Sequence, residues 1–281
     1  MFTLNCRGKL LSLQKPVVMG ILNMTQDSFY APSRHQASDS LLSTAEKMLK
    51  AGAALLDIGG QSTRPGSRTL SAQEEAAAVI PAVAALHKAF PEAILSVDTF
   101  YSTVAAAAVE AGASVVNDIS AGTIDPDMFA TVAALNVPYV LMHMQGRPET
   151  MQQQPYYDNV TQEVLDFFIE KLALLKKAGV KDVVLDPGFG FGKTTTHNFT
   201  LLKNLRQFMI LNCALLLGVS RKGTIYRTLG TTAEGALNGT TVLNTIGLMN
   251  GAHILRVHDV REAMEAIILL QHYPEAIPSS L

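Results

Sequence analysis

The chain has 281 residues and a formal net charge of −2, and 48% of its residues are hydrophobic. A nearly neutral chain without a basic run is not expected to bind nucleic acid, and its apolar stretches are too short to span a bilayer. Cys6 and Cys213 are too few for a disulfide framework, and residues 1–9 do not read as a signal peptide. We therefore expect a cytoplasmic protein whose substrates are small molecules.

Short apolar runs recur eight times along the chain, separated by segments with helical periodicity. Runs of this kind are typical of parallel strands buried on both faces. The expected strands are Val17–Leu22, Ala54–Ile58, Ile94–Val97, Ser114–Val116, Tyr139–Met142, Val183–Leu185, Leu215–Val219 and Ile254–Val257. Eight βα units predict an α/β protein with a (β/α)8 barrel, the TIM barrel, which typically takes roughly 250 residues. We expect residues 1–281 to form one domain.

The segments between the strands predict the helices. We expect them near residues 38–51, 71–89, 102–111, 126–135, 159–178, 197–207, 233–250 and 259–272. Ser71 and Glu74 have the spacing of a capping box at the start of the second helix, and Gly112 and Gly179 are placed to end helices.

The first residues predict a separate small element. Residues 4–13 alternate weakly in polarity around Gly8, which favours a hairpin. We expect this hairpin, within residues 1–15, to cover the bottom of a barrel formed by residues 16–272.

Polar side chains gather where the expected strands end, and TIM barrels build their sites at that face. Arg256 and His258 lie two residues apart on the last strand, so both point to one side and predict an anion site. The alternative is that Arg256 pairs with a neighbouring acid such as Asp259. A catalytic site is favoured because a buried charge without a partner or ligand is costly.

The loop after the second strand also suits phosphate. Residues 59–66 combine glycine amides, the hydroxyls of Ser62 and Thr63, and Arg64 before a rigid Pro65-Gly66 turn. Asn23, at the end of the first strand, is a neutral oxygen ligand that suits Mg²⁺ beside a diphosphate. The sequence has no cluster of Cys and His residues with the spacing of a zinc site.

Asp98, Asn117 and Asp186 end three other strands. Two carboxylates and an amide can accept hydrogen bonds from the N–H groups of a flat heterocycle, with Met142 and Phe191 as apolar walls. Paired carboxylates also serve glycosidases, but those sites usually include aromatic sugar platforms, and this chain has no Trp.

Three further groups at the strand ends are interpreted in different ways. Lys222 adds a positive charge at the carboxyl-terminal mouth of the expected barrel. His143 fits either a site or the core, so we leave it out of the site. Residues 188–194 resemble a phosphate loop, but that pattern needs glycine where this chain has Pro187.

Nine strings of the sequence, in order along nearly the whole chain, resemble those of the dihydropteroate synthase family. They are GILNMT at 20–25, DSF at 27–29, STRPG at 62–66, SVDT at 96–99, NDI at 117–119, LMHM at 141–144, DPGFGFGK at 186–193, SRK at 220–222 and RVHD at 256–259. The resemblance implies a transferase of folate biosynthesis. Such an enzyme condenses 6-hydroxymethyl-7,8-dihydropterin diphosphate with 4-aminobenzoate, uses Mg²⁺, forms homodimers and is a sulfonamide target.

The resemblance also implies roles for individual residues. The pterin would be held by Asp98, Asn117, Asp186, Lys222 and Met142. The diphosphate would be held by Thr63, Arg256, His258 and, through Mg²⁺, Asn23. The aminobenzoate would be held by Phe29, Arg64, Pro65, Phe191 and Lys222. Catalysis would depend on Arg256, His258 and Lys222, which stabilise the departing charge and hold the reacting groups.

Four positions depart from the commonest family pattern, namely Gln26, Ala31, Gln61 and Gly223. They cluster near the second substrate, so a pterin-binding paralogue with weak or no synthase activity stays an alternative. A pterin-dependent methyltransferase would share the barrel but has no need of the diphosphate residues. A scaffold protein would not need so many polar groups at one face.

Overall fold

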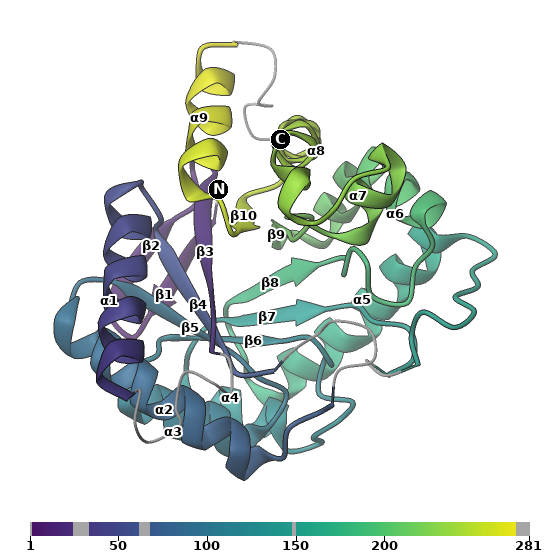
Figure 1. The fold of residues 1–281 in the computed structure, drawn as a ribbon. Helices are drawn as coiled ribbons and strands as arrows, with labels where there is room; N and C mark the ends of the chain where they lie inside the picture. The colour runs from purple at the N-terminus through teal and green to yellow at the C-terminus, as the bar shows by residue number, and fades with distance from the viewer. Residues whose placement is uncertain (1, 25–33, 62–67, 148–149, 274–281) are drawn as a thin grey trace.

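The computed structural model describes residues 2–24, 34–61, 68–147 and 150–273. Eight parallel strands close into a barrel in which each strand pairs with its neighbours in sequence and the last pairs with the first (Figure 1). The strands are β3 Val17–Asn23, β4 Leu55–Gly59, β5 Ile94–Asp98, β6 Val115–Asp118, β7 Tyr139–Met142, β8 Val183–Asp186, β9 Ala214–Leu217 and β10 Ile254–Val257. The predicted (β/α)8 barrel is confirmed.

Helices surround the barrel on the outside (Figure 1). They are α1 Arg34–Lys50, α2 Ala72–Ala89, α3 Ser102–Ala111, α4 Met128–Leu135, α5 Val160–Ala178, α6 Thr195–Lys203, α7 Gly223–Leu229, α8 Leu237–Met249 and α9 Val260–Gln271, with 3₁₀ turns η2 Leu205–Leu211 and η3 Glu234–Ala236. The Ser71–Glu74 capping box and the terminal positions of Gly112 and Gly179 are confirmed.

Two predictions about the helices were wrong. The segment 197–207 is not one helix, because α6 ends before Asn204 and a 3₁₀ turn follows. The expected helices also omitted α7, whose seven residues begin with a glycine and include β-branched side chains that give a weak helical signal. No helix among the described residues has both the length and the apolar character needed to cross a bilayer.

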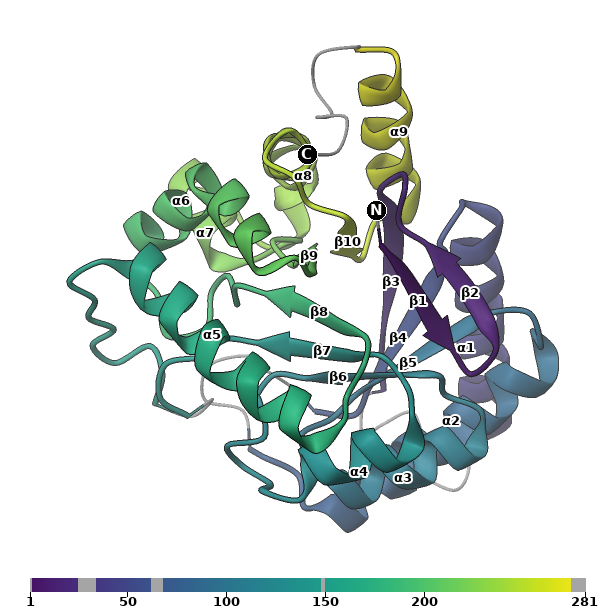
Figure 2. The ribbon, with the colours of Figure 1, turned by 180° about the vertical axis from the view of Figure 1, so that it is seen from behind.

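The N-terminal hairpin covers the end of the barrel where the strands begin (Figure 2). Its strands are β1 Thr3–Cys6 and β2 Lys9–Ser12, paired antiparallel. Leu4, Cys6, Leu11 and Leu13 pack against the first inward-facing side chains of the barrel. The Asn5 amide donates to the Asp182 carboxylate at 2.8 Å, which ties the hairpin to the start of β8. The predicted plug is thus present.

The barrel interior changes character between its first and second layers of side chains. The first layer is apolar, and its members include Leu55, Ile94, Val115, Val184 and Ile254. Two residues further along each strand, on the same inward face, the side chains are Asp57, Ser96, Asn117, Asp186 and Arg256. The outward-facing residues, such as Leu56, Val97 and Leu185, pack under the helices. Polar groups therefore begin about 7 Å above the sealed end of the barrel.

Candidate active site

Three acceptor groups lie together at the carboxyl ends of the strands, as the sequence predicts. Asp98 and Asn117 are directly paired in the β5–β6 register, and Asp186 pairs with Met142 in the β7–β8 register. All three side chains are buried. Asp186 Oδ1 accepts from the Gly188 amide at 2.8 Å. Asp98 Oδ1, Asn117 Oδ1 and Asp186 Oδ2 have no hydrogen-bond partner among the described residues. These oxygens can therefore receive N–H groups from a ligand.

Arg256 does not pair with Asp259, which was the alternative considered from the sequence. Its Nε donates to Asp57 Oδ2 at 2.6 Å, and its Nη2 donates to Asp98 Oδ2 at 2.5 Å. Burial alone would lower the pKa of Arg256, but Asp57 and Asp98 hold it above its ordinary value. The guanidinium therefore stays charged inside the barrel, fixed from two strands.

Asp259 pairs instead with Arg221, in the turn that follows β9. The two side chains form a bidentate contact of 2.9 and 2.6 Å. In the same turn, Ser220 Oγ accepts from the His258 backbone N–H at 3.2 Å and lies 3.0 Å from His258 Nδ1. These contacts fix the turn after β9 to the end of β10.

The Ser220 hydroxyl is in hydrogen-bond contact with the His258 ring at Nδ1. When the hydroxyl donates to Nδ1, the hydrogen of the neutral ring lies on Nε2. Desolvation and the nearby cations of Arg256 and Arg221 lower the pKa of His258 to about 4. The ring is therefore neutral at pH 7 and, in this tautomer, presents an N–H donor at the barrel mouth.

Lys222 lies between the acceptor cluster and an aromatic ring. Its Nζ donates to the Phe189 carbonyl at 2.6 Å and lies 4.5 Å from the centre of the Phe191 ring. Burial lowers the pKa of Lys222 to about 8, although the Asp186 carboxylate opposes this shift. The ammonium is thus charged at pH 7 and loses its proton at a moderately alkaline pH.

The buried carboxylates show the opposite pKa shift. Burial raises the pKa of Asp98 to about 7, with Arg256 opposing the shift and the Asp57 carboxylate adding to it. Burial also raises the pKa of Asp186, against the attraction of the Lys222 ammonium. A ligand that donates N–H groups to these carboxylates would stabilise their ionised forms.

The predicted apolar walls also come together. Met142 and Phe191 belong to one buried cluster with Phe100, Ile119 and Met151 at the carboxyl end of the barrel. The Phe191 ring therefore has an apolar support on one side and the Lys222 ammonium on another. A flat ring bound here would contact side chains that exclude water.

Lys193 explains why the glycine-rich segment after β8 is not a phosphate loop. Its buried amino group donates to the carbonyls of Gly188 and Phe191, both at 3.0 Å, and contacts His143 Nδ1 at 2.8 Å, and burial lowers the pKa of Lys193 well below its ordinary value. Burial lowers the pKa of His143 to about 2, so its ring is neutral. Gly188 has a φ of +71°, and a Cβ atom there would collide with the His143 carbonyl. Lys193 therefore fixes this loop, and His143 belongs to its packing.

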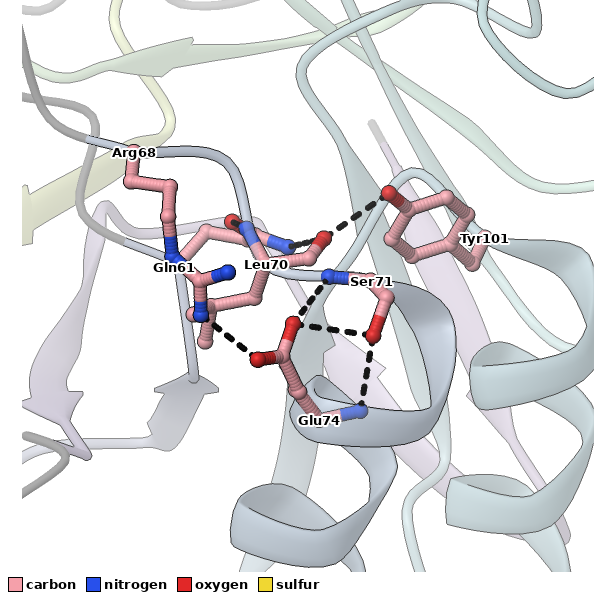
Figure 3. A network of polar contacts seen from close by, with 6 residues as sticks. All are labelled: Gln61, Arg68, Leu70, Ser71, Glu74 and Tyr101. Carbon is pink, nitrogen blue, oxygen red and sulfur yellow. Dashed lines mark hydrogen bonds and ion pairs between the residues drawn. The ribbon is translucent and has the colours of Figure 1, made fainter.

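Gln61 closes the base of the loop that follows β4 (Figure 3). Its Oε1 accepts from the Leu70 amide at 3.0 Å, and its Nε2 donates to the Leu70 carbonyl at 3.1 Å and to Glu75. Tyr101 Oη donates to the same Leu70 carbonyl at 2.8 Å. Glutamate at position 61 could make only the acceptor contact and would face the Glu75 carboxylate. The amide is thus the better fit for this environment.

Several predicted site residues lie outside the described residues. They are Thr63, Arg64, Pro65 and Phe29, together with the departures Gln26 and Ala31. Their roles stay predictions. Asn23 is described: it ends β3, is exposed, and its side chain has no partner among the described residues.

Sequence reasoning missed Asp57. This residue is fully buried on β4 and accepts hydrogen bonds from Ser96, Asn117 and Arg256. The signal was present, because Asp57 is the only charged residue in the apolar run Ala54–Ile58. A charge inside a buried strand needs a partner, so the residue should have been placed among the candidates.

Known proteins resemble the chain over nearly its whole length. Residues 19–258 match the family described as pterin binding enzyme. Dihydropteroate synthase of Escherichia coli (strain K12) is 42% identical over 267 residues, which are 94% of either protein. The chain belongs to the dihydropteroate synthase family. The resemblance drawn from the motifs is thereby confirmed, and this family member is an enzyme of the transferase class.

Solved structures of the family agree with this fold. Dihydropteroate synthase of Yersinia pestis, solved with a sulfonamide drug complex, superposes with a TM-score of 0.91 at 41% identity, covering 97% of this chain and 99% of the other. The synthase of Xanthomonas albilineans in complex with 7,8-dihydropteroate gives a TM-score of 0.87 at 36% identity, and the match covers 99% of this chain and 100% of the other.

Proposed function

We propose that this family member condenses 6-hydroxymethyl-7,8-dihydropterin diphosphate with 4-aminobenzoate to give 7,8-dihydropteroate and diphosphate. The observation that carries the proposal is the set of unpartnered acceptor oxygens on the buried residues Asp98, Asn117 and Asp186, beside Arg256 and Lys222. A pterin offers several N–H groups along one edge of a flat ring, and a set of fixed acceptors suits such an edge.

The diphosphate would lie toward the mouth of the barrel, above the pterin. With the Ser220 hydroxyl donating to Nδ1, His258 would offer an Nε2 hydrogen there, and the partly buried Arg256 supplies the positive charge. Asn23 fits a site for Mg²⁺, because its unpartnered amide oxygen ends β3 at this face and Mg²⁺ needs only one or two protein ligands beside phosphate oxygens. When bound, the ion would neutralise part of the leaving-group charge.

The reaction breaks the C–O bond to the diphosphate and forms a C–N bond to the aminobenzoate amine, which loses a proton. Arg256 and His258 stabilise the charge that builds on the departing oxygen. Met142 and Phe191 exclude water from the electron-poor pterin methylene. Lys222 and Phe191 are placed to hold the ring of the second substrate. Loops with Phe29, Arg64 and Pro65 are proposed to complete that pocket, and Thr63 is proposed to bind the diphosphate.

One assay tests the proposal. The purified chain is incubated with the pterin diphosphate, Mg²⁺ and 4-aminobenzoate, and dihydropteroate is measured by chromatography. Product that depends on all three components supports the synthase. Tight pterin binding without product identifies the paralogue alternative, and methyl transfer from a methylated pterin identifies the methyltransferase.

We also propose a homodimer that works in the cytoplasm. Exposed apolar side chains gather on α8 and α9, where Val242, Ile246, Met249, Ile268 and Leu269 are each more than a third exposed. Burial of such a face between two copies would remove apolar surface from water. Cys6 and Cys213 are both free thiols, which persist in a reducing compartment. Light scattering after size-exclusion chromatography tests the dimer.

A further inference from the structure

Asp57 lies beneath the proposed pterin pocket and holds two of its residues. Its Oδ2 accepts from Asn117 Nδ2 at 3.0 Å and from Arg256 Nε at 2.6 Å. Its Oδ1 accepts from Ser96 Oγ at 2.5 Å. The carboxylate is fully buried, and its three donors come from three different strands. Asp57 is therefore the point at which β4, β5, β6 and β10 are joined inside the barrel.

The contact with Asn117 decides which end of that amide faces the ligand. A carboxylate can only accept, so it takes the Nδ2 end of Asn117 and leaves Oδ1 on the other side. Asn117 Oδ1 has no partner among the described residues. Without the Asp57 carboxylate, nothing in the contacts of Asn117 would prefer this orientation over its 180° flip, which would present a donor to the ligand's N–H groups.

The contact with Arg256 fixes the second element. The guanidinium is planar, and its Nε and Nη2 groups are bonded to Asp57 and Asp98 respectively. Two anchors of this kind define both the position and the plane of the group. If Asp57 were absent, Arg256 would keep one anchor and could turn about it.

We propose that Asp57 is a positioning residue that orients the Asn117 amide as an acceptor for the pterin and holds Arg256 in place for diphosphate release. The inference rests on the proposed synthase function. Asp57 acts through Asn117 and Arg256 and does not itself contact the reacting atoms.

The test compares two variants of the same buried contact set. Asp57→Leu has a similar volume but no acceptor atom, so the contacts from Ser96, Asn117 and Arg256 are all lost. Ser96→Ala removes one donor from the same carboxylate and leaves Asn117 and Arg256 untouched. We expect Asp57→Leu to weaken binding of the unphosphorylated pterin alcohol at least tenfold and to lower kcat at least thirtyfold. Ser96→Ala should keep both the pterin affinity and kcat within about threefold of the parent.

A charge-relocated double variant separates positioning from general damage and keeps the test informative if Asp57→Leu folds poorly. Asp57→Asn combined with Asn117→Asp restores a hydrogen bond between the two positions with its direction reversed, and an acceptor oxygen again faces the pterin. We expect affinity for the pterin alcohol to return to within about fivefold of the parent. The kcat should stay low, because Arg256 keeps Asp98 but still lacks the Asp57 carboxylate.

The outcomes are distinct. Parent-like binding and kcat in Asp57→Leu would overturn the inference, as would an equal loss in Ser96→Ala. A double variant that folds but does not recover pterin affinity would overturn the role through Asn117. If the parent chain binds the pterin but forms no dihydropteroate, the proposed function fails while the binding comparison still decides the orientation of Asn117.

Discussion

The two ends of the barrel interior are built from the same strands but differ completely in chemistry. At the sealed end, Leu55, Ile94 and Ile254 pack with the hairpin in a dry apolar cluster. Two residues further along the same strands, Asp57, Ser96 and Arg256 form a buried charged network. The apolar end stabilises the fold, and this stability permits the costly burial of charge at the other end. The comparison predicts that substitutions at the apolar end will change mainly the free energy of unfolding, whereas substitutions at the charged end will also change ligand binding and kinetics.

The largest effect is expected for Arg256→Ala. The substitution leaves Asp57 and Asp98 without their buried cation, which should lower the free energy of unfolding by about 3–5 kcal/mol. It should also weaken binding of the pterin diphosphate by about 2–4 kcal/mol. Denaturant titration and calorimetric titration measure the two quantities. Affinity for the pterin alcohol should fall less, and an equal loss for both ligands would remove Arg256 from the diphosphate site.

A matched substitution at the sealed end should separate stability from activity. Leu216→Ala creates a cavity among fully buried side chains and should lower the free energy of unfolding by about 2–4 kcal/mol. The kcat and both KM values should stay within twofold of the parent at a temperature where the variant is folded. Leu10→Ala, on the exposed side of the hairpin, is the control that should change neither the free energy of unfolding nor the kinetic constants. A large change in KM for Leu216→Ala would show that the two ends are coupled.

The pH dependence of kcat/KM should depend on ionisable groups at the charged end of the barrel and not on the apolar end. Asp98, with a pKa of about 7, accepts from the pterin when it is ionised, so activity should rise as the pH increases through that value. Lys222, with a pKa of about 8, must keep its proton, so activity should fall above that pH. We expect a bell-shaped profile of kcat/KM between these values, with limiting slopes of about tenfold per pH unit. Asp98→Asn should lose the acidic limb, and an unchanged limb would assign it to another group.

The smallest effect is expected for Gly223→Ser, at the rim. A Cβ atom there would meet Arg227 Nε and Tyr226 Oη at 3.4 Å, which is ordinary contact, so the added hydroxyl has room. Because Arg227 can share that hydroxyl, the KM for 4-aminobenzoate should fall about threefold to tenfold. The KM for the pterin diphosphate should not change. Steady-state kinetics measure both, and an unchanged aminobenzoate KM would mean that Gly223 does not face the second substrate.

The sequence alone predicted the barrel because its eight apolar runs and their helical separators repeat with a regular spacing. It also predicted that Asp98, Asn117 and Asp186 meet, since the carboxyl ends of parallel strands share one face. It could not give the partner of Arg256, because the contact with Asp57 spans 199 positions and depends on the register of the closed barrel. Asp57 escaped notice because its strand was treated as uniformly apolar, although an inward face can change from apolar to polar within two residues.

The hairpin plug has a consequence for the order of events during turnover. Because Leu4, Leu11 and Leu13 close the end of the barrel where the strands begin, the route to the acceptor cluster, in the part of the chain that the structure describes, is through the opposite mouth. A ligand that binds deepest must then arrive before the one that binds above it. The condensed product must leave before the next deep ligand can enter. Architecture alone thus predicts compulsory-order kinetics, with the pterin as the leading substrate.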